Sequence, residues 1–157
     1  MLKIQRLNHA VLYVHDAPRV ARFYQDVLGF AVRAQMGERA VFLVTNPETS
    51  NNHDLGLFGI DPNAPGPTRG ERVGLYHRAW QVDSLPELAE VRDRLVEAHA
   101  LVGTNDHGSS LSLYAHDPDG NEFEVFWQVP EEEWATRKGG HLDIEGEMAK
   151  RGTLERA

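Results

Sequence analysis

The chain of 157 residues contains no cysteine. Disulfide bonds, thiolate metal ligands and cysteine nucleophiles are therefore excluded, and any bound metal must be held by nitrogen and oxygen donors. No apolar run approaches the roughly 20 residues that a membrane-spanning helix needs, and the chain does not open with a secretory signal. We therefore expect a cytoplasmic protein that interacts with no membrane.

Basic residues are too few to balance the acidic ones, because 16 Lys and Arg stand against 24 Asp and Glu, for a net charge of −8. That charge argues against nucleic acid or an anionic membrane surface as the main partner. Hydrophobic residues make up 41% and charged residues 25% of the chain, which is typical of a globular protein of one compact domain. Eight histidines are a mild excess.

The predicted elements follow one order in both halves of the chain. In module one, residues 4–60, a helix begins at the N-cap Asp16 and ends at Gly29. One strand-like run precedes this helix and three follow it, at 7–14, 30–36, 39–45 and 54–60. A linker rich in proline and glycine, 61–72, then separates the two halves.

Module two, residues 73–129, repeats this order. A strand-like run at 73–82 leads into a helix that begins with the capping box Ser84-Leu-Pro-Glu87. A short strand follows from Leu101, and a hairpin at 111–126 completes the module. Two βαβββ modules predict an α+β fold built on a structural repeat.

The repeat makes residues 1–129 one domain, and beyond it the pattern stops. Residues 130–134 have proline and acids where a short helix would begin. The rest of the tail, 130–157, is charged, contains glycine and has little periodicity. We expect the tail to be mobile or to pack on a partner subunit.

The hairpin of module two carries a carboxylate in an unusual place. Asp119-Gly120 is a strong turn signal, and a hairpin centred there puts Tyr114 directly opposite Glu124. Glu124 lies in mid-strand between Phe123 and Val125, where a carboxylate is costly unless it is paired or bound to a cation. The sequence therefore predicts a partner for Glu124.

Two histidines occupy equivalent places, His9 in the first strand of module one and His77 in the first strand of module two. Together with Glu124 they match the set of two histidines and one carboxylate that binds Fe(II), or a look-alike such as Mn(II), and leaves coordination positions open. Each residue alone is more typical of a structural role. Their equivalent placement in a repeated unit favours the metal site.

Three segments around these residues resemble the vicinal oxygen chelate superfamily, which holds glyoxalase I, antibiotic-resistance proteins and extradiol ring-cleaving dioxygenases. They are Leu-Asn-His9-Ala-Val-Leu, Tyr-His77-Arg-Ala-Trp and Asp117-Pro-Asp-Gly-Asn-Glu-Phe-Glu124. The resemblance covers residues 4–129 and is strongest to single-module catechol 2,3-dioxygenases. It implies a curved mixed sheet of two modules around a central metal site, with His9, His77 and Glu124 as ligands, and a homodimer.

Three further residues match segments of the dioxygenase branch, and their roles are those that the resemblance implies. His53, in Asn52-His53-Asp54, matches a histidine on the dioxygen side of the metal. His107, in Asp106-His107-Gly108, matches a second histidine on the substrate side, and Tyr114 matches an active-site tyrosine. Taken singly, these residues are equally typical of a strand cap, an exposed turn and a core position.

One absence bears on the kind of enzyme. Glyoxalase-like members use four protein ligands, including an acid in the last strand of the first half. Aligning the two halves puts Gly56 where Glu124 lies in the second, and glycine has no side chain to bind a metal. A shift of this alignment would bring in Asp54 as a fourth ligand, so that alternative stays open.

The resemblance thus implies an extradiol dioxygenase that uses Fe(II), or alternatively Mn(II) or another divalent metal, with O2 and a small aromatic diol as substrates. One alternative is another metal-dependent member of the superfamily, a glyoxalase-like isomerase or a fosfomycin-type thiol transferase. A second is a metal-free drug-binding resistance protein. The sequence does not identify the catechol.

Overall fold

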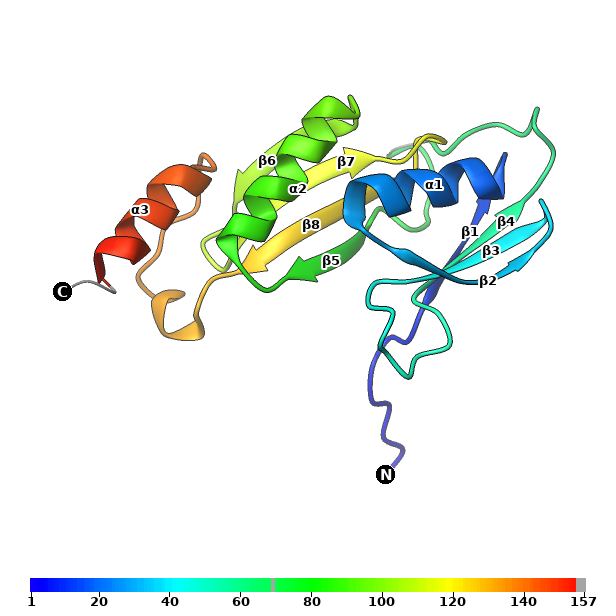
Figure 1. The fold of residues 1–157 in the computed structure, drawn as a ribbon. Coiled ribbons are helices and arrows are strands. Elements are labelled where there is room, and N and C mark those ends of the chain that lie inside the picture. The colour runs from blue at the N-terminus through cyan, green and yellow to red at the C-terminus, as the bar shows by residue number, and fades with distance from the viewer. Residues whose placement is uncertain (69, 155–157) are drawn as a thin grey trace. The chain divides into compact units, whose positions relative to one another are not determined.

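The computed structural model describes residues 1–68 and 70–154, and the chain divides into two compact units, Met1–Pro67 and Thr68–Ala157 (Figure 1). Each unit contains one four-stranded mixed sheet and a helix that packs on it. The predicted α+β fold of two βαβββ modules is confirmed. No helix in the described part of the chain is long and apolar enough to cross a membrane.

Unit one holds the first module, with strand order β1-β4-β3-β2. The pair β1–β4 is parallel and the other two pairs are antiparallel. Its elements are β1 (Ala10–Val14), α1 (Ala17–Leu28), β2 (Ala31–Met36), β3 (Ala40–Val44) and β4 (Leu55–Gly59).

Local signals at both ends of α1 explain where it begins and stops. The Asp16 side chain accepts a hydrogen bond from Arg19 N at 2.8 Å, and Gly29 ends the helix in the left-handed conformation with φ of 72°. The helix buries Val20 and Tyr24 completely. Full burial of such a side chain contributes about 1.5–3 kcal/mol, so this apolar stripe fixes α1 on the sheet.

Unit two holds the second module, with strand order β5-β8-β7-β6, and β5–β8 is again the parallel pair. The capping box is confirmed, since Ser84 Oγ accepts from Glu87 N and the Glu87 carboxylate accepts from Asp83 N. The elements of this unit are β5 (Arg78–Val82), α2 (Leu85–Glu97), β6 (Leu101–Asp106), β7 (Ser110–His116), β8 (Glu122–Gln128), η1 (Glu131–Glu133) and α3 (Ile144–Leu154).

The registers of the two parallel pairs show that the halves are equivalent residue by residue. Val11 of β1 pairs with Gly56 of β4, and Ala79 of β5 pairs with Glu124 of β8. Val11 and Ala79 each lie two residues after a histidine. The alignment that sets Gly56 against Glu124 is therefore confirmed by the strand pairing.

The predicted starts of the two first strands are wrong. The strands begin at Ala10 and Arg78, so that His9 and His77 lie just ahead of them and not within them. The cause is the length of the partner strand, because the ladder begins with Ala10 opposite Leu55 and with Arg78 opposite Phe123. Residues further upstream have no ladder partner in these sheets.

The tail, which was expected to be mobile or to pack on a partner subunit, forms regular structure in its described residues. The tail forms η1, where a short helix was predicted, and α3, and both belong to unit two. Ile144 at the start of α3 is only 1% exposed, and Arg92 of α2 forms an ion pair with Glu145. Trp134 donates its indole N–H to Val129 O at 2.7 Å. These contacts attach the tail to its own module.

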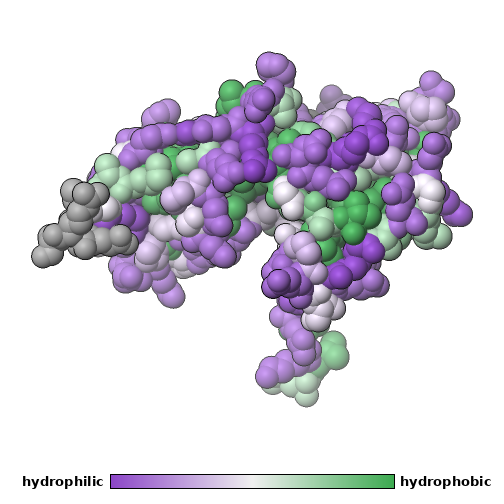
Figure 2. All heavy atoms as spheres, viewed as in Figure 1, coloured by the Kyte–Doolittle hydropathy of each residue, from purple (hydrophilic) through white to green (hydrophobic). Residues whose placement is uncertain are grey.

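The visible surface is mainly hydrophilic. Hydrophilic residues predominate on the face shown in Figure 2, and apolar side chains appear there in smaller areas.

The large apolar side chains that pack each sheet against its helix are buried in both units. They include Leu43, Leu55 and Leu57 in unit one and Leu88, Leu111, Leu113 and Phe123 in unit two.

The turn between β7 and β8 is held by one buried carboxylate. Asp117 Oδ1 accepts from the backbone N–H groups of Asp119 and Asn121, both at 3.0 Å. Asp117 Oδ2 lies 3.3 Å from Nη2 of Arg78, and both side chains are buried. Arg78 follows His77 directly, so this ion pair also fixes the start of β5.

We expect Asp117→Ala to lower the free energy of unfolding by about 3–5 kcal/mol, because it removes the carboxylate that is paired with the buried Arg78 guanidinium. Urea unfolding followed by circular dichroism measures this loss. Glu97→Ala, at an exposed site on α2, serves as the control and is expected to change the same quantity by less than about 0.5 kcal/mol. A loss below about 1 kcal/mol for Asp117→Ala would contradict the role given to the ion pair.

Candidate active site

In unit two, a histidine just ahead of β5 and a carboxylate of β8 meet. His77 Nε2 lies 3.2 Å from Glu124 Oε2, and their side chains are 26% and 12% exposed. Two donors that bind one ion at right angles, each about 2.1 Å from it, lie about 3 Å apart. The separation therefore fits two adjacent ligands of one metal ion.

The ring nitrogen of His77 that faces Glu124 is Nε2, and imidazole nitrogen and carboxylate oxygen are both common ligands of divalent metals. His77 Nδ1 is buried and has no hydrogen-bond partner among the described residues, and a metal ion bound at Nε2 would not reach it. The chemistry of the Nε2 and carboxylate pair fits a divalent metal.

Tyr114 and His107 extend this group on the same face of the sheet. Tyr114 of β7 pairs directly with Glu124 of β8, so the predicted register is confirmed. The Tyr114 hydroxyl lies 2.7 Å from Nε2 of His107, which is in the turn between β6 and β7. The Tyr114 ring also packs edge-on against His77, with 5.7 Å between ring centroids.

The hydrogen bonds around Tyr114 have one consistent direction. Asn105 Nδ2 donates to Nδ1 of His107 at 3.0 Å, so the neutral His107 ring carries its proton on Nε2 and donates it to the Tyr114 oxygen. Tyr114 in turn donates its hydroxyl proton to Glu124. Burial, the nearby charges of Glu124 and Tyr76 and this last hydrogen bond raise the pKa of Tyr114 above its usual value. The phenol is therefore held protonated beside the carboxylate.

Unit one brings together the other two predicted histidines. The rings of His9 and His53 lie 4.3 Å apart between centroids, and the ring of Phe42 packs on His53. His9 Nδ1 is 2.8 Å from the carbonyl oxygen of the Asn8 side chain, which sets the ring proton on Nδ1 and leaves the Nε2 lone pair for a ligand. Burial and the charge of His9 lower the pKa of His53, which favours a neutral ring.

A polar network that the sequence analysis missed holds His9 in place. Asn8 donates to Asn51 Oδ1 at 2.9 Å, and Asn51 donates to His53 O at 2.9 Å and to Asp54 Oδ1 at 2.5 Å. The sequence signals this network only by asparagine residues, at position 8 and at positions 51–52. Such a run is equally typical of a loop.

Asp54 belongs to this structural network. Its Oδ2 accepts from both N and Oγ1 of Thr45, at 2.8 and 3.0 Å. Burial alone would raise the pKa of Asp54, but the hydrogen bonds from Thr45 and Asn51 hold it below its usual value. Both carboxylate oxygens are occupied by protein donors, which argues against Asp54 as a fourth metal ligand.

The residues predicted for the site are distributed over both units of the chain. Neither unit by itself contains, in its described residues, a group of three His, Asp or Glu side chains able to hold a metal. Unit two supplies the pair His77 and Glu124 together with Tyr114 and His107, and unit one supplies His9 and His53.

The fold agrees with what the chain is similar to. The sequence profile of the Glyoxalase/Bleomycin resistance protein/Dioxygenase superfamily matches residues 6–125. The chain therefore belongs to this superfamily.

Among curated relatives, the chain is 29% identical over 155 residues to the catechol-2,3-dioxygenase of Bacillus subtilis (strain 168), covering 93% of this chain and 52% of the relative. It is 36% identical over 128 residues to biphenyl-2,3-diol 1,2-dioxygenase 3 of Rhodococcus globerulus, covering 76% of this chain and 62% of the relative. The chain thus spans between half and two thirds of the length of these two relatives.

Among solved structures, this chain is similar to a lactoylglutathione lyase from Agrobacterium tumefaciens, with a TM-score of 0.58 and 26% sequence identity. The match covers 79% of this chain and 94% of the other. These likenesses place the chain in a superfamily that contains both dioxygenases and other enzymes.

We expect Glu124→Gln to lower the pKa of Tyr114 in the metal-free chain, because it removes a negative charge that disfavours the phenolate. The pKa stays above its usual value, since burial of the phenol is unchanged. Tyrosine labelled with ¹³C at the ζ carbon reports this titration by NMR, and Tyr114→Phe assigns the signal.

Glu122→Gln, two residues earlier on β8, is the matched control and is expected to leave the Tyr114 pKa unchanged. An equal fall in both variants, or no fall with Glu124→Gln, would contradict the described coupling.

Proposed function

We propose that the protein is an extradiol dioxygenase, which binds Fe(II) through His9, His77 and Glu124 and cleaves a catechol-type aromatic with O2. The observation that carries this proposal is the strand register that puts Gly56 in the place of Glu124, because glycine has no side chain to act as the fourth ligand of a glyoxalase-like site. The names of two curated relatives, both ring-diol dioxygenases, support the same reaction class.

The donor set suits this chemistry. An Fe(II) ion held by two imidazoles and one carboxylate would keep coordination positions open for a chelating diol and for dioxygen, and would let electrons pass from the diol to dioxygen. The short distance between His77 and Glu124 supports the assignment of these two residues as ligands. The free Nε2 of His9, set by its bond to Asn8, supports the third. Mn(II) or another divalent metal is the alternative occupant.

On the substrate side we assign His107 and Tyr114 to the oxygens of the diol. The Tyr114 phenol is held neutral by burial and by Glu124, so it donates a hydrogen bond without ionising. His107 donates from Nε2 to the Tyr114 oxygen and fixes its orientation. A diol oxygen entering here would accept a hydrogen bond from one of these two groups in place of the bond between them.

On the dioxygen side we assign His53. Its lowered pKa keeps the ring neutral near pH 7, so that it has both a donor and an acceptor nitrogen. A neutral imidazole beside His9 can stabilise charge that develops on a bound oxygen by donating a hydrogen bond. The homodimer and the cytoplasmic location stay predictions.

We expect the chain loaded anaerobically with Fe(II) to consume O2 only when a simple catechol is present, and to form a yellow ring-opened product. Oxygen uptake measured with an electrode, beside the visible spectrum, tests this. Turnover of a substrate in the absence of O2 would favour an isomerase or transferase of the superfamily. Absence of bound metal after loading would favour a drug-binding protein.

We expect the site variants to fall into two classes. His9→Ala, His77→Ala and Glu124→Ala each lose bound iron, and activity with it, because each removes a ligand. Tyr114→Phe and His107→Ala keep the iron and lower kcat by about 10²- to 10³-fold, the usual cost of removing one hydrogen-bond donor directed at developing charge.

His141→Ala removes an exposed histidine and is the control, with iron content and kcat expected to stay within twofold of the parent. Iron content is measured by a colorimetric chelator, and kcat by oxygen uptake. Retention of full iron content by His77→Ala or Glu124→Ala would contradict the ligand assignment.

A further inference from the structure

The turn that carries His107 is held by hydrogen bonds among its own residues. His107 N donates to Ser110 O at 2.9 Å, and Gly108 N donates to the Asp106 side chain at 2.8 Å. Gly108 has φ of 81°, a left-handed conformation that suits glycine. The direction in which the His107 ring points therefore depends on where this turn is fixed.

A segment that lies far along the chain, residues 137–140, packs on this turn. Asp106 N donates to Gly140 O at 3.1 Å, and Gly140 N donates to Asp106 O at 2.7 Å, which makes an isolated antiparallel bridge. A Cβ added at Gly139 would lie 2.5 Å from Asp106 O and 3.1 Å from the carbonyl carbon of His107. Only glycine fits against the His107 backbone at this point.

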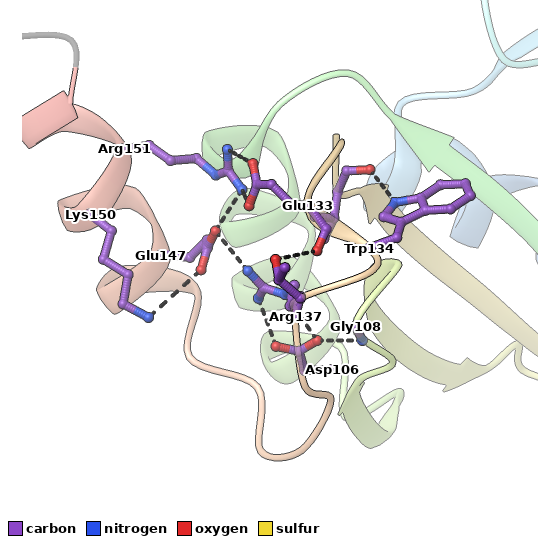
Figure 3. A network of polar contacts seen from close by, with 10 residues as sticks. Asp106, Gly108, Glu133, Trp134, Arg137, Glu147, Lys150 and Arg151 are labelled. Atoms are coloured by element: carbon purple, nitrogen blue, oxygen red, sulfur yellow. Dashed lines mark hydrogen bonds and ion pairs between the residues drawn. The ribbon is translucent and has the colours of Figure 1, made fainter. Parts of the chain in front are cut away.

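Arg137 joins this segment to the turn and to α3. Its guanidinium lies 2.7 Å from Asp106 Oδ2 and 3.0 Å from Glu147 Oε1, as Figure 3 shows. The three side chains are 16%, 11% and 5% exposed for Arg137, Asp106 and Glu147. Charge-assisted hydrogen bonds of this length, shielded from water, are about twice as strong as neutral ones.

Helix α3 fixes the far end of this network. Glu147 also pairs with Arg151 at 2.7 Å, and Arg151 pairs with Glu133 of η1 at 3.0 Å. The Arg151 guanidinium lies 4.7 Å from the ring centroid of Trp127 on β8. The tail thus reaches from β8 back to the turn between β6 and β7, all within unit two.

We infer that the tail of the chain positions His107: Arg137 and Gly139, anchored by α3, fix the 106–110 turn so that the His107 ring meets Tyr114. Arg137 is a positioning residue, since it acts on the His107 and Tyr114 pair through Asp106 and the turn backbone. The effect of this contact on turnover rests on the proposed function. The contact itself does not.

The first test reads the His107 ring directly in the full chain without metal. Long-range ¹H–¹⁵N spectra of histidine are expected to show one His107 tautomer with its proton on Nε2 in the parent. Arg137→Ala and Gly139→Ala are expected to turn this into a mixture of tautomers or to shift both nitrogen signals.

The matched controls lie beside the tested residues. A Cβ added at Gly140 meets nothing within 4 Å, so Gly140→Ala changes the same segment without touching the turn. Arg92→Ala removes a second ion pair that joins α3 to α2 but does not reach the turn. Both controls are expected to keep the parent His107 signals.

The second test uses the Fe(II)-loaded full chain. Arg137→Ala and Gly139→Ala are expected to lower kcat about 10- to 100-fold with KM and iron content unchanged, because a misplacement of about 1 Å can cost that much. In a His107→Ala background either change is expected to lower kcat further by less than twofold, since both act through the same ring. Arg137→Lys keeps the charge but loses the planar guanidinium group. Its kcat is expected to lie between those of the parent and of Arg137→Ala.

Unchanged His107 signals in both Arg137→Ala and Gly139→Ala would overturn the inference. Equal changes in Gly140→Ala and Arg92→Ala would also overturn it, because they would mark a general loss of packing. If Arg137→Ala does not fold, Gly139→Ala and Arg137→Lys decide the question. If the parent shows no catechol cleavage, the proposed function fails while the tautomer measurement still decides the inference.

Discussion

The pairing of Tyr114 with Glu124 across β7 and β8 is the constraint on which the site in unit two depends. It puts a carboxylate and a phenol on the face of the sheet that is turned away from the buried Leu113 and Val125. A shift by one residue would part the two side chains and send one of them into the apolar core. The turn beneath them is held by Asp117, whose ion pair with Arg78 also fixes the residue after His77. One buried carboxylate thus sets the positions of two candidate ligands.

Electrostatics divides the candidate residues by role. His77 and Glu124 form a donor pair at the distance expected of two ligands of one ion, whereas Asp54 has its carboxylate oxygens occupied by Thr45 and Asn51. The two acidic side chains therefore have different roles. Glu124 is available to a cation, and Asp54 holds a loop that positions His9 through Asn8.

The sequence predicted those parts of the fold that depend on local chemistry. The N-cap at Asp16, the left-handed Gly29 and the turn after Asp117 each follow from a few neighbouring residues, and each is confirmed. The starts of β1 and β5 were wrong because a strand ends where its partner ends, which sequence periodicity does not record. The tail was misjudged because α3 is held by ion pairs such as Arg137 with Glu147, and ion pairs between distant residues leave no periodic pattern.

For the site, the sequence and the resemblance singled out the histidines, the tyrosine and the glutamate, and the structure adds the residues that hold them. Asn8, Asn105 and Arg137 were missed because amides and arginines in loops are common and have no fixed spacing.

Pulsed EPR of the Mn(II)-loaded chain tests most directly the central claim, that two histidines and one glutamate bind one metal ion. We predict couplings from two imidazole nitrogens and from exchangeable water protons at the open positions. A third imidazole, a single imidazole or the absence of bound water would contradict a site built from His9, His77 and Glu124.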